Sequence, residues 1–306
     1  MLDETPNAVA ALRRAFRSAK APDRITQEPY DSTAQHLRRL AKLELGQRAD
    51  SKDLWEYTQD LLYGNEIQDA LLAHALPFCL EAWREDLLGT SSGYGGFVEH
   101  FYPLLANRPV FELHLSPSQS AAAADFMREA ILEEIDAQRG LTYRAKGARP
   151  YRWIAALATY GVVLPDLERL WNSWWSLETI GGATATMQHI SCLMYPENEN
   201  PVFAPWTSNE GGGPPKLWEF EGHLYSHKWL PTNVAFLKRA LTPQGVAEVL
   251  AEAVSNLADD EAAPIALGIQ EDFPLCMDTL KSRCSELPRI LETRDDTAKP
   301  LLEWTK

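Results

Sequence analysis

The sequence predicts a mainly α-helical protein, either an irregular multi-helix domain or an α-solenoid-like array, with a small β-hairpin insertion. Apolar side chains recur at spacings of three and four along most of the chain, which is typical of helices with one buried face. Glycine and proline mark helix ends at short intervals, and short connectors favour antiparallel packing of neighbouring helices. No repeat with a period of about 30–45 residues is evident, so no particular repeat family is indicated.

The helices of the first half are predicted from their start and stop signals. Ser116 is the expected N-cap of the best-marked helix, with Pro117 at the first helical position and Gln119 completing a capping box. The helices expected up to Gly140 lie at 7–20, between Ser32 and Gly46, at 52–63, at 66–88 with Pro77 expected to kink or split it, and from Pro117 onward. Between the last two, RPVFELHLSP, residues 108–117, alternates apolar and polar residues and is consistent with a strand.

The second half is also predicted to be helical, apart from one interruption. Helices are expected near 151–163, 165–178 and 183–195, from 232 onward, after the Thr242-Pro243 cap, and as one or two acidic helices within 261–293. Spacings of three and four place Trp171, Trp174 and Trp175 on one side of their helix. Such a cluster belongs more often to the core or to a helix–helix interface than to a ligand cage, so we expect core.

The interruption at 197–231 is rich in proline and glycine and divides the chain. The predicted parts are an N-terminal helix and linker at 1–30, a helical domain at 31–196, a loop with a hairpin at 197–231, helices at 232–293 that belong to the same or a second helical domain, and a tail at 294–306.

The charge of the chain is strongly acidic and uneven. Its net charge is -14, and residues 51–140 carry 15 acids and 5 bases, whereas residues 248–296 carry 12 acids and 4 bases. Nucleic acid is an unsuitable partner because phosphate repels such a surface. A basic protein partner is expected, since opposite fields steer association, although simple solubility also explains an acidic surface.

The compartment is predicted to be the cytoplasm. The 4 cysteines are widely spaced and include no CxxC pair, which is typical of buried thiols in a reducing compartment. The N-terminal MLDETPNAVAALRRAF has early acids and no apolar core, so it does not resemble a signal peptide. No segment is apolar enough to span a bilayer, so no membrane association is expected.

The densest chemistry lies in GGGPPKLWEFEGHLYSHKW, residues 211–229. In a helix, His223 and His227 would share one face and could bind zinc, with His189 and Cys192 as further possible donors. A hairpin that turns at Glu221-Gly222 fits the strand-forming residues better, and positions four apart on a strand are separated by about 13 Å. We therefore expect no metal and no cofactor.

The hairpin would gather Trp218, Phe220, His223 and Tyr225 on one face, which either packs on the helical body or contacts a partner. The candidate binding residues are Trp206, Glu210, Trp218, Glu219, Phe220, His223 and Tyr225.

These observations favour a non-catalytic acidic binding protein, for example an inhibitor or an immunity protein that neutralises a basic toxin. The alternative is a hydrolase of a carbohydrate or another polar small molecule, with a cleft edged by Trp206, Glu210, Glu219 and His223. Against it, no spacing singles out a carboxylate pair among 43 acids, and no HExxH occurs. A zinc protein that uses His223 and His227 is the third hypothesis.

Overall fold

A computed structural model describes residues 8–30, 33–64, 66–90, 97–141, 152–195 and 229–292. Within these ranges the chain forms fourteen helices and no extended strand, which confirms the predicted mainly helical fold. The hairpin predicted at 216–229 lies outside the described residues, apart from Trp229.

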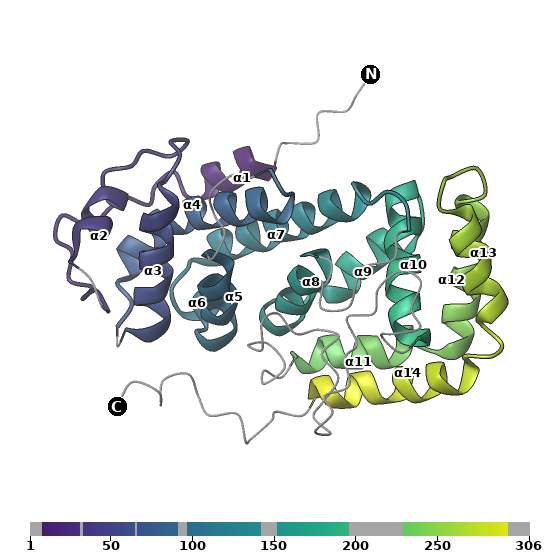
Figure 1. The fold of residues 1–306 in the computed structure, drawn as a ribbon. Coiled ribbons are helices and arrows are strands. Elements are labelled where there is room, and N and C mark those ends of the chain that lie inside the picture. Colours follow the sequence, from purple (N-terminus) through teal and green to yellow (C-terminus); the bar gives the residue numbers. More distant parts are fainter. Residues whose placement is uncertain are drawn as a thin grey trace. The chain divides into compact units, whose positions relative to one another are not determined.

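The described residues form two compact units, which comprise 8–130 and 131–292 (Figure 1). In chain order the helices are α1 (Ala8–Ala15), α2 (Gln35–Leu40), α3 (Ser51–Tyr63), α4 (Asp69–Leu87), α5 (Phe97–Asn107), α6 (Val110–Leu113), α7 (Pro117–Asp136), α8 (Arg152–Val163), α9 (Leu167–Trp175), α10 (Ile180–Met194), α11 (Pro231–Ala240), α12 (Pro243–Asn256), α13 (Ala263–Asp272) and α14 (Met277–Glu292). The predicted division at 197–231 stays a prediction, because most of that segment lies outside the described ranges.

The first unit is organised around α3, which packs against α2, α4 and α5, while α1 packs against α4. Its core is aromatic as well as aliphatic, and Tyr57, Trp83 and Phe101 are fully buried. The indole Nε1 of Trp83 donates to the hydroxyl of Tyr102 at 3.1 Å, so the largest core side chain keeps its polar atom satisfied. His74 and Cys79 of α4 are also buried in this core.

The second unit is organised around α10, which packs against α9, α12 and α14. Every residue of α10 from Gly181 to Met194 is buried, as expected for a helix that is apolar or small on all sides. Beyond α10, α11 packs against α9 and α14, and α12 packs against α13 and α14. None of the helices in the described ranges is both long and apolar enough to cross a membrane.

The helix ends show which sequence signals were decisive. The capping box of α7 is confirmed, because the Ser116 amide donates to Gln119 Oε1 at 3.0 Å and the Gln119 amide donates to Ser116 Oγ at 3.4 Å. Thr242 caps α12 by accepting from the Gly245 amide at 3.1 Å. The helix predicted at 66–88 is not split, because α4 runs through Pro77 as one element.

The strand considered at 108–117 is wrong. Val110–Leu113 form the short helix α6, closed by a hydrogen bond from the His114 amide to the Val110 carbonyl at 3.2 Å. No neighbouring strand exists among the described residues to pair with this segment, so a local turn is what satisfies its backbone. The alternation was misleading, since Phe111 is buried whereas Leu113 is 68% exposed.

Candidate functional site

The seven predicted binding residues, Trp206, Glu210, Trp218, Glu219, Phe220, His223 and Tyr225, all lie outside the described residues. The structure therefore neither gathers nor separates them. What the structure does describe is Trp229, which directly follows this segment and belongs to the second unit. This indole is 3% exposed, and its backbone amide donates to the Leu291 carbonyl at 2.9 Å.

A close contact fixes the position of Trp229. A methyl group added to Gly161 on α8 would lie 2.5 Å from Cε3 of Trp229, so only glycine allows the ring to lie against the helix. Two residues further on, α11 begins, and its buried Asn233 donates to the carbonyls of Gly161 and Leu164 at 2.8 and 2.7 Å. The end of the segment that holds the predicted site is thus firmly attached to α8.

A surface of the second unit combines exposed leucines with acidic residues. Leu267 on α13 is 49% exposed, and Leu275, in the turn that follows, is 85% exposed. Leu267 and Glu271 are four residues apart and share one face of α13. The turn after α13 holds Leu275, whose amide donates to the Asp272 carbonyl at 2.9 Å. We use the name α13 face for these two leucines together with the exposed acids of the same C-terminal helices and turns, Glu252, Asp259, Glu261, Glu271 and Asp278.

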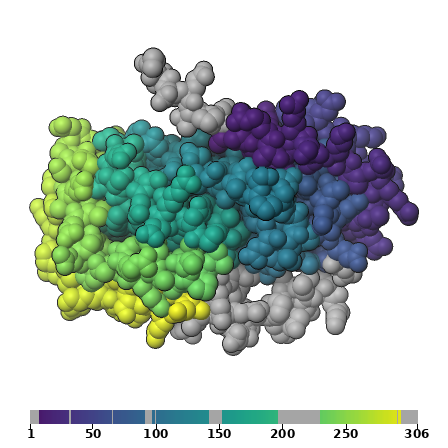
Figure 2. Space-filling model, turned by 180° about the vertical axis from the view of Figure 1, so that it is seen from behind, coloured from purple at the N-terminus to yellow at the C-terminus, as the bar shows by residue number. Residues whose placement is uncertain are grey.

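The α13 face carries uncompensated negative charge. Glu252, Asp259, Glu261 and Glu271 are exposed, and none forms an ion pair with another residue in the described part of the chain. The other side of α13 explains why its leucine is not needed for the core, since Ala262, Ala266 and Ile269 already pack inward. Figure 2 shows α12–α14 as the green and yellow surface of the second unit.

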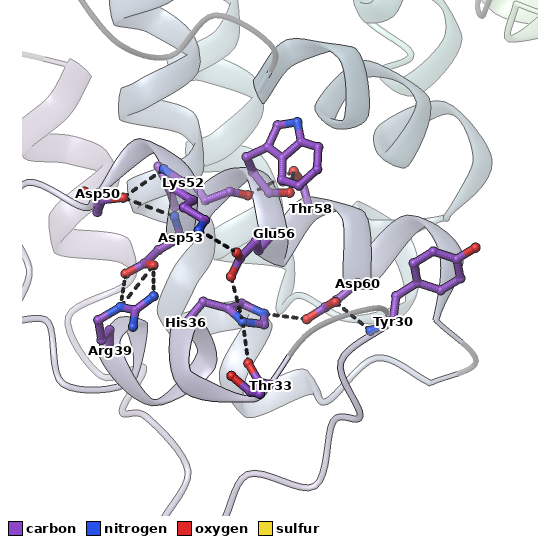
Figure 3. A network of polar contacts seen from close by, with 12 residues as sticks. Tyr30, Thr33, His36, Arg39, Asp50, Lys52, Asp53, Glu56, Thr58 and Asp60 are labelled. Carbon is purple, nitrogen blue, oxygen red and sulfur yellow. Dashed lines mark hydrogen bonds and ion pairs between the residues drawn. The ribbon is translucent and has the colours of Figure 1, made fainter.

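A second constellation, in the first unit, is a buried network of charged groups around His36 (Figure 3). His36 is fully buried on α2. Its Nε2 lies 2.6 Å from Asp60 Oδ2, and its Nδ1 lies 3.2 Å from both the Thr33 carbonyl and Glu56 Oε2. Both ring nitrogens therefore face oxygen atoms, one a backbone carbonyl and the others side-chain carboxylates.

The network continues on both sides of His36. Asp60 Oδ1 accepts from the Tyr30 amide at 2.7 Å, and beside it the guanidinium of Arg39 lies against Asp53 of α3, with Nε 2.8 Å from Oδ2 (Figure 3). A histidine between two carboxylates resembles acid–base machinery. However, His36 is 0% exposed and Asp60 2% exposed, so a substrate has no access to the pair. The network attaches the segment before α2 to α3.

A third constellation surrounds His189 in the second unit, and it confirms that the tryptophan cluster belongs to the core. Trp171 and Trp174 are 1% and 2% exposed. The His189 ring stands edge-on to Trp171, Trp174 and Trp175, with centroids 5.4, 6.0 and 5.9 Å away. Burial lowers the pKa of His189 to about 3, so the ring is neutral at physiological pH.

A chain of hydrogen bonds leads from this core to a carboxyl group near the end of α7. Trp153 Nε1 donates to Gln188 Oε1 at 2.9 Å, Gln188 Nε2 donates to Gln138 Oε1 at 3.1 Å, and Gln138 Nε2 donates to Glu134 Oε1 at 3.0 Å. Burial raises the pKa of Glu134 to about 7, against the opposing influence of Arg152. A carboxyl group that titrates near neutrality is a property shared by general acids and by structural buried acids.

No family model, curated protein or solved structure matches this chain. The functional argument therefore rests on the chain's own residues.

Metal and nucleophile chemistry find little support in the part of the chain that the structure describes. No group of three His, Cys, Asp or Glu side chains there is placed to hold a metal ion. His189 and Cys192, the possible additional zinc donors, are both fully buried on α10. Burial also raises the pKa of the Cys192 thiol, and that of the Cys79 thiol to about 12, so neither forms a reactive thiolate.

The GTSSG run at 89–93 matches the letters of a GxSxG nucleophile motif. That motif works on a sharp turn between a strand and a helix. Here Gly89 instead follows helix α4, with a φ of 66° that is typical of a glycine ending a helix. The preceding element is therefore of the wrong type for a nucleophile elbow.

Sequence reasoning missed the His36 network, although a signal for it exists. Asp53, Glu56 and Asp60 have spacings of three and four, which place three acids on one face of α3, and His36 and Arg39 are three apart on α2. Matching the two faces to each other required the tertiary structure. The exposed leucines of α13 were equally hidden, because a leucine in a helix is by default assigned to the core.

Proposed function

We propose that this protein is a non-catalytic binding protein for a basic protein partner, and that it acts as an inhibitor or adaptor, an immunity protein being one concrete form. The observation that carries the proposal is the α13 face. Large exposed apolar side chains close to unpaired charge are a common property of interaction sites.

The charge of this region defines the partner. Between 248 and 292 the described chain carries ten acids, and its bases are Lys281, Arg283 and Arg289. Arg283 is turned inward, where its Nη1 donates to the carbonyls of Cys192 and Tyr195 at 2.8 and 2.7 Å. The outer surface is thus more acidic than the residue count suggests, and a cationic surface is its electrostatic complement.

The leucines give the partner a second property. A purely ionic contact would be weak in physiological salt, because exposed ion pairs contribute about 0–1 kcal/mol each. Leu267 and Leu275 offer apolar area that a partner can cover. The expected partner surface therefore has lysine or arginine side chains around a small apolar depression. The predicted hairpin, with Trp218, Phe220 and Tyr225, would add aromatic contacts to the same function.

The test is a comparison of baits in lysate of the native host, followed by binding kinetics with the captured protein. The charge-reversal variant is Glu252→Lys, Glu261→Lys and Glu271→Lys. The matched control reverses three exposed acids of the first unit, Glu44→Lys, Glu66→Lys and Glu112→Lys. A third bait carries Leu267→Ser and Leu275→Ser.

A basic protein should bind the wild type and the control alike. With the charge-reversal variant its association rate should fall by at least about tenfold at low salt, because rim charges act mainly on association. The leucine variant should instead dissociate faster. The proposal would be contradicted if the captured protein associated equally fast with the wild type, the control and the charge-reversal variant. Capture of an acidic protein only would contradict it as well.

A further inference from the structure

The first unit has an open surface depression of about 380 Å³ lined by arginines and apolar side chains, in sharp contrast to the acidity of the whole chain. Its lining residues are Val9, Ala10, Arg13, Arg14, Arg17 and Leu45. Three of the six are cationic and none is acidic. The helix α1 that supplies most of them lies at the surface of its unit and is purple in Figures 1 and 2.

One wall of this arginine pocket is held rigidly. The Arg13 guanidinium binds Glu81 of α4 with two nitrogens, Nε at 2.8 Å and Nη2 at 2.7 Å. Its remaining nitrogen, Nη1, lies beside Gly46, where an added methyl group would be 3.5 Å away. Gly46 has a φ of 99°, so the neighbouring turn favours glycine. The side chain therefore needs no ordering when a ligand enters.

The other two arginines are available to a ligand. Arg14 and Arg17 are exposed, lie three residues apart, and form no ion pair with any residue in the described ranges. Arginines near a helix C-terminus also interact favourably with the helix dipole, which by itself explains why arginines occur here. The dipole does not explain why they line a depression together with apolar side chains. Leu12 and Phe16, both fully buried, anchor the opposite side of the helix and so fix the direction of this face.

We propose that the arginine pocket binds a small amphiphilic anion, that is, a phosphate or carboxylate group attached to an apolar body. Guanidinium groups match the geometry of these anions and bind them with paired hydrogen bonds. Val9, Ala10 and Leu45 supply an apolar contact for the rest of the molecule. This site lies in the first unit and does not depend on the function proposed for the α13 face.

The test is calorimetric titration of the full chain with octyl phosphate below its micelle concentration. Inorganic phosphate serves as the isolated head group and octyl glucoside as the uncharged amphiphile. The pocket variant is Arg14→Gln with Arg17→Gln, and the matched control is Arg24→Gln with Arg38→Gln, which removes two exposed arginines of the same unit. A second variant, Leu45→Ser, probes the apolar wall.

Octyl phosphate should bind with a Kd below about 1 mM, and inorganic phosphate and octyl glucoside should each bind at least about tenfold more weakly. The pocket variant should lose at least about tenfold in affinity for octyl phosphate while the control changes less than about twofold. Leu45→Ser should weaken the binding of octyl phosphate but leave the affinity for inorganic phosphate unchanged. Binding that is equal in the pocket and control variants, or no binding by a well-folded wild type, would overturn the proposal.

The source of the anion is distinguished with vesicles. If phosphatidylglycerol vesicles bind the wild type and the control variant but not the pocket variant, the anion is a lipid head group. Binding of octyl phosphate with no attachment to these vesicles would identify a free ligand. Attachment that is insensitive to Arg14 and Arg17 would contradict the assigned site.

Discussion

Replacing Asn233 with alanine should destabilise the second unit far more than its size suggests. The side chain is 1% exposed and joins three elements: it donates to the carbonyls of Gly161 and Leu164, and its Oδ1 accepts from the Leu167 amide at 3.3 Å. After truncation, Gly161 keeps a second donor, the Leu230 amide at 3.2 Å. The Leu164 carbonyl and the Leu167 amide lose their bonds with Asn233.

The magnitude follows from these two groups. Leaving a buried polar group unsatisfied costs about 1–2 kcal/mol, and the lost packing adds about 1 kcal/mol, so Asn233→Ala should lower the free energy of unfolding by about 3–5 kcal/mol. Asn256→Ala is the matched control. Asn256 is exposed and makes one bond, from Nδ2 to the Leu177 carbonyl at 3.0 Å, so its loss should cost about 0.5–1 kcal/mol.

The assay is urea unfolding followed by tryptophan fluorescence, combined with hydrogen exchange of peptides from α8, α9 and α11. Exchange locates the effect, which matters because two units need not unfold in one step. Faster exchange should be confined to these three helices. If Asn233→Ala and Asn256→Ala reduced stability by the same amount, Asn233 would not hold α11 to α8 and α9 in the way inferred here.

Two further predictions concern glycines and pH. Gly181→Ala should destabilise the protein by at least about 2 kcal/mol, since the new methyl group would lie 2.2 Å from the Asp136 carbonyl oxygen. Gly268→Ala on α13 meets nothing within 4 Å and should stabilise the protein by about 0.5–1 kcal/mol. The urea midpoints of the two variants check this prediction, and equal shifts of both midpoints would refute it. Burial lowers the pKa of His189 to about 3, so below pH 6.5 the unfolded chain binds a proton that the folded chain does not. The free energy of unfolding should therefore fall by about 3–5 kcal/mol as the pH is lowered from 6.5 to 3. The raised pKa of Glu134, about 7, has the opposite effect, because the folded chain holds this proton more tightly than the unfolded chain. As the pH rises from 4.5 through 7, the free energy of unfolding should fall by about 1–2 kcal/mol, a figure already reduced for the partial exposure of Glu134. His189→Phe should flatten the acid limb alone and Glu134→Gln the neutral limb alone; unchanged pH profiles would contradict both assignments.

Much of the helical fold was accessible from local signals. The caps at Ser116 and Thr242 act within four residues of chain, so their hydrogen bonds are encoded in short stretches of sequence. Helix α5, at Phe97–Asn107, was not anticipated. It contains Pro103 and most of its residues are apolar, so its helicity depends on packing against α3.

The candidate sites could not be predicted to the same degree, for a different physical reason. His36 and Asp60 are 24 residues apart, and their contact exists only once α2 lies on α3. Leu275 is likewise exposed because no other part of the described chain packs over it, and a local sequence pattern carries no information about such packing. The residues that the sequence did single out, from Trp206 to Tyr225, owe their prominence to aromatic composition, and they lie in a segment whose arrangement the structure does not describe.

The coexistence of the arginine pocket with a net charge of -14 is physically consistent. At about 0.1 M salt, the Debye length is about 10 Å, so exposed charges further apart than this are largely screened. An anion in the pocket therefore senses mainly the nearby charges, Arg14, Arg17 and the Arg13–Glu81 pair, whereas a large basic partner contacts many acids together and responds to their summed field. The same protein can thus bind both a small anion and a basic protein, because the anion responds to charges within a few ångströms and the basic protein responds to the field of many acids. It follows that added salt should slow association at the α13 face and also weaken the pocket. Reversing three acids on the α13 face should reduce the salt dependence of that association.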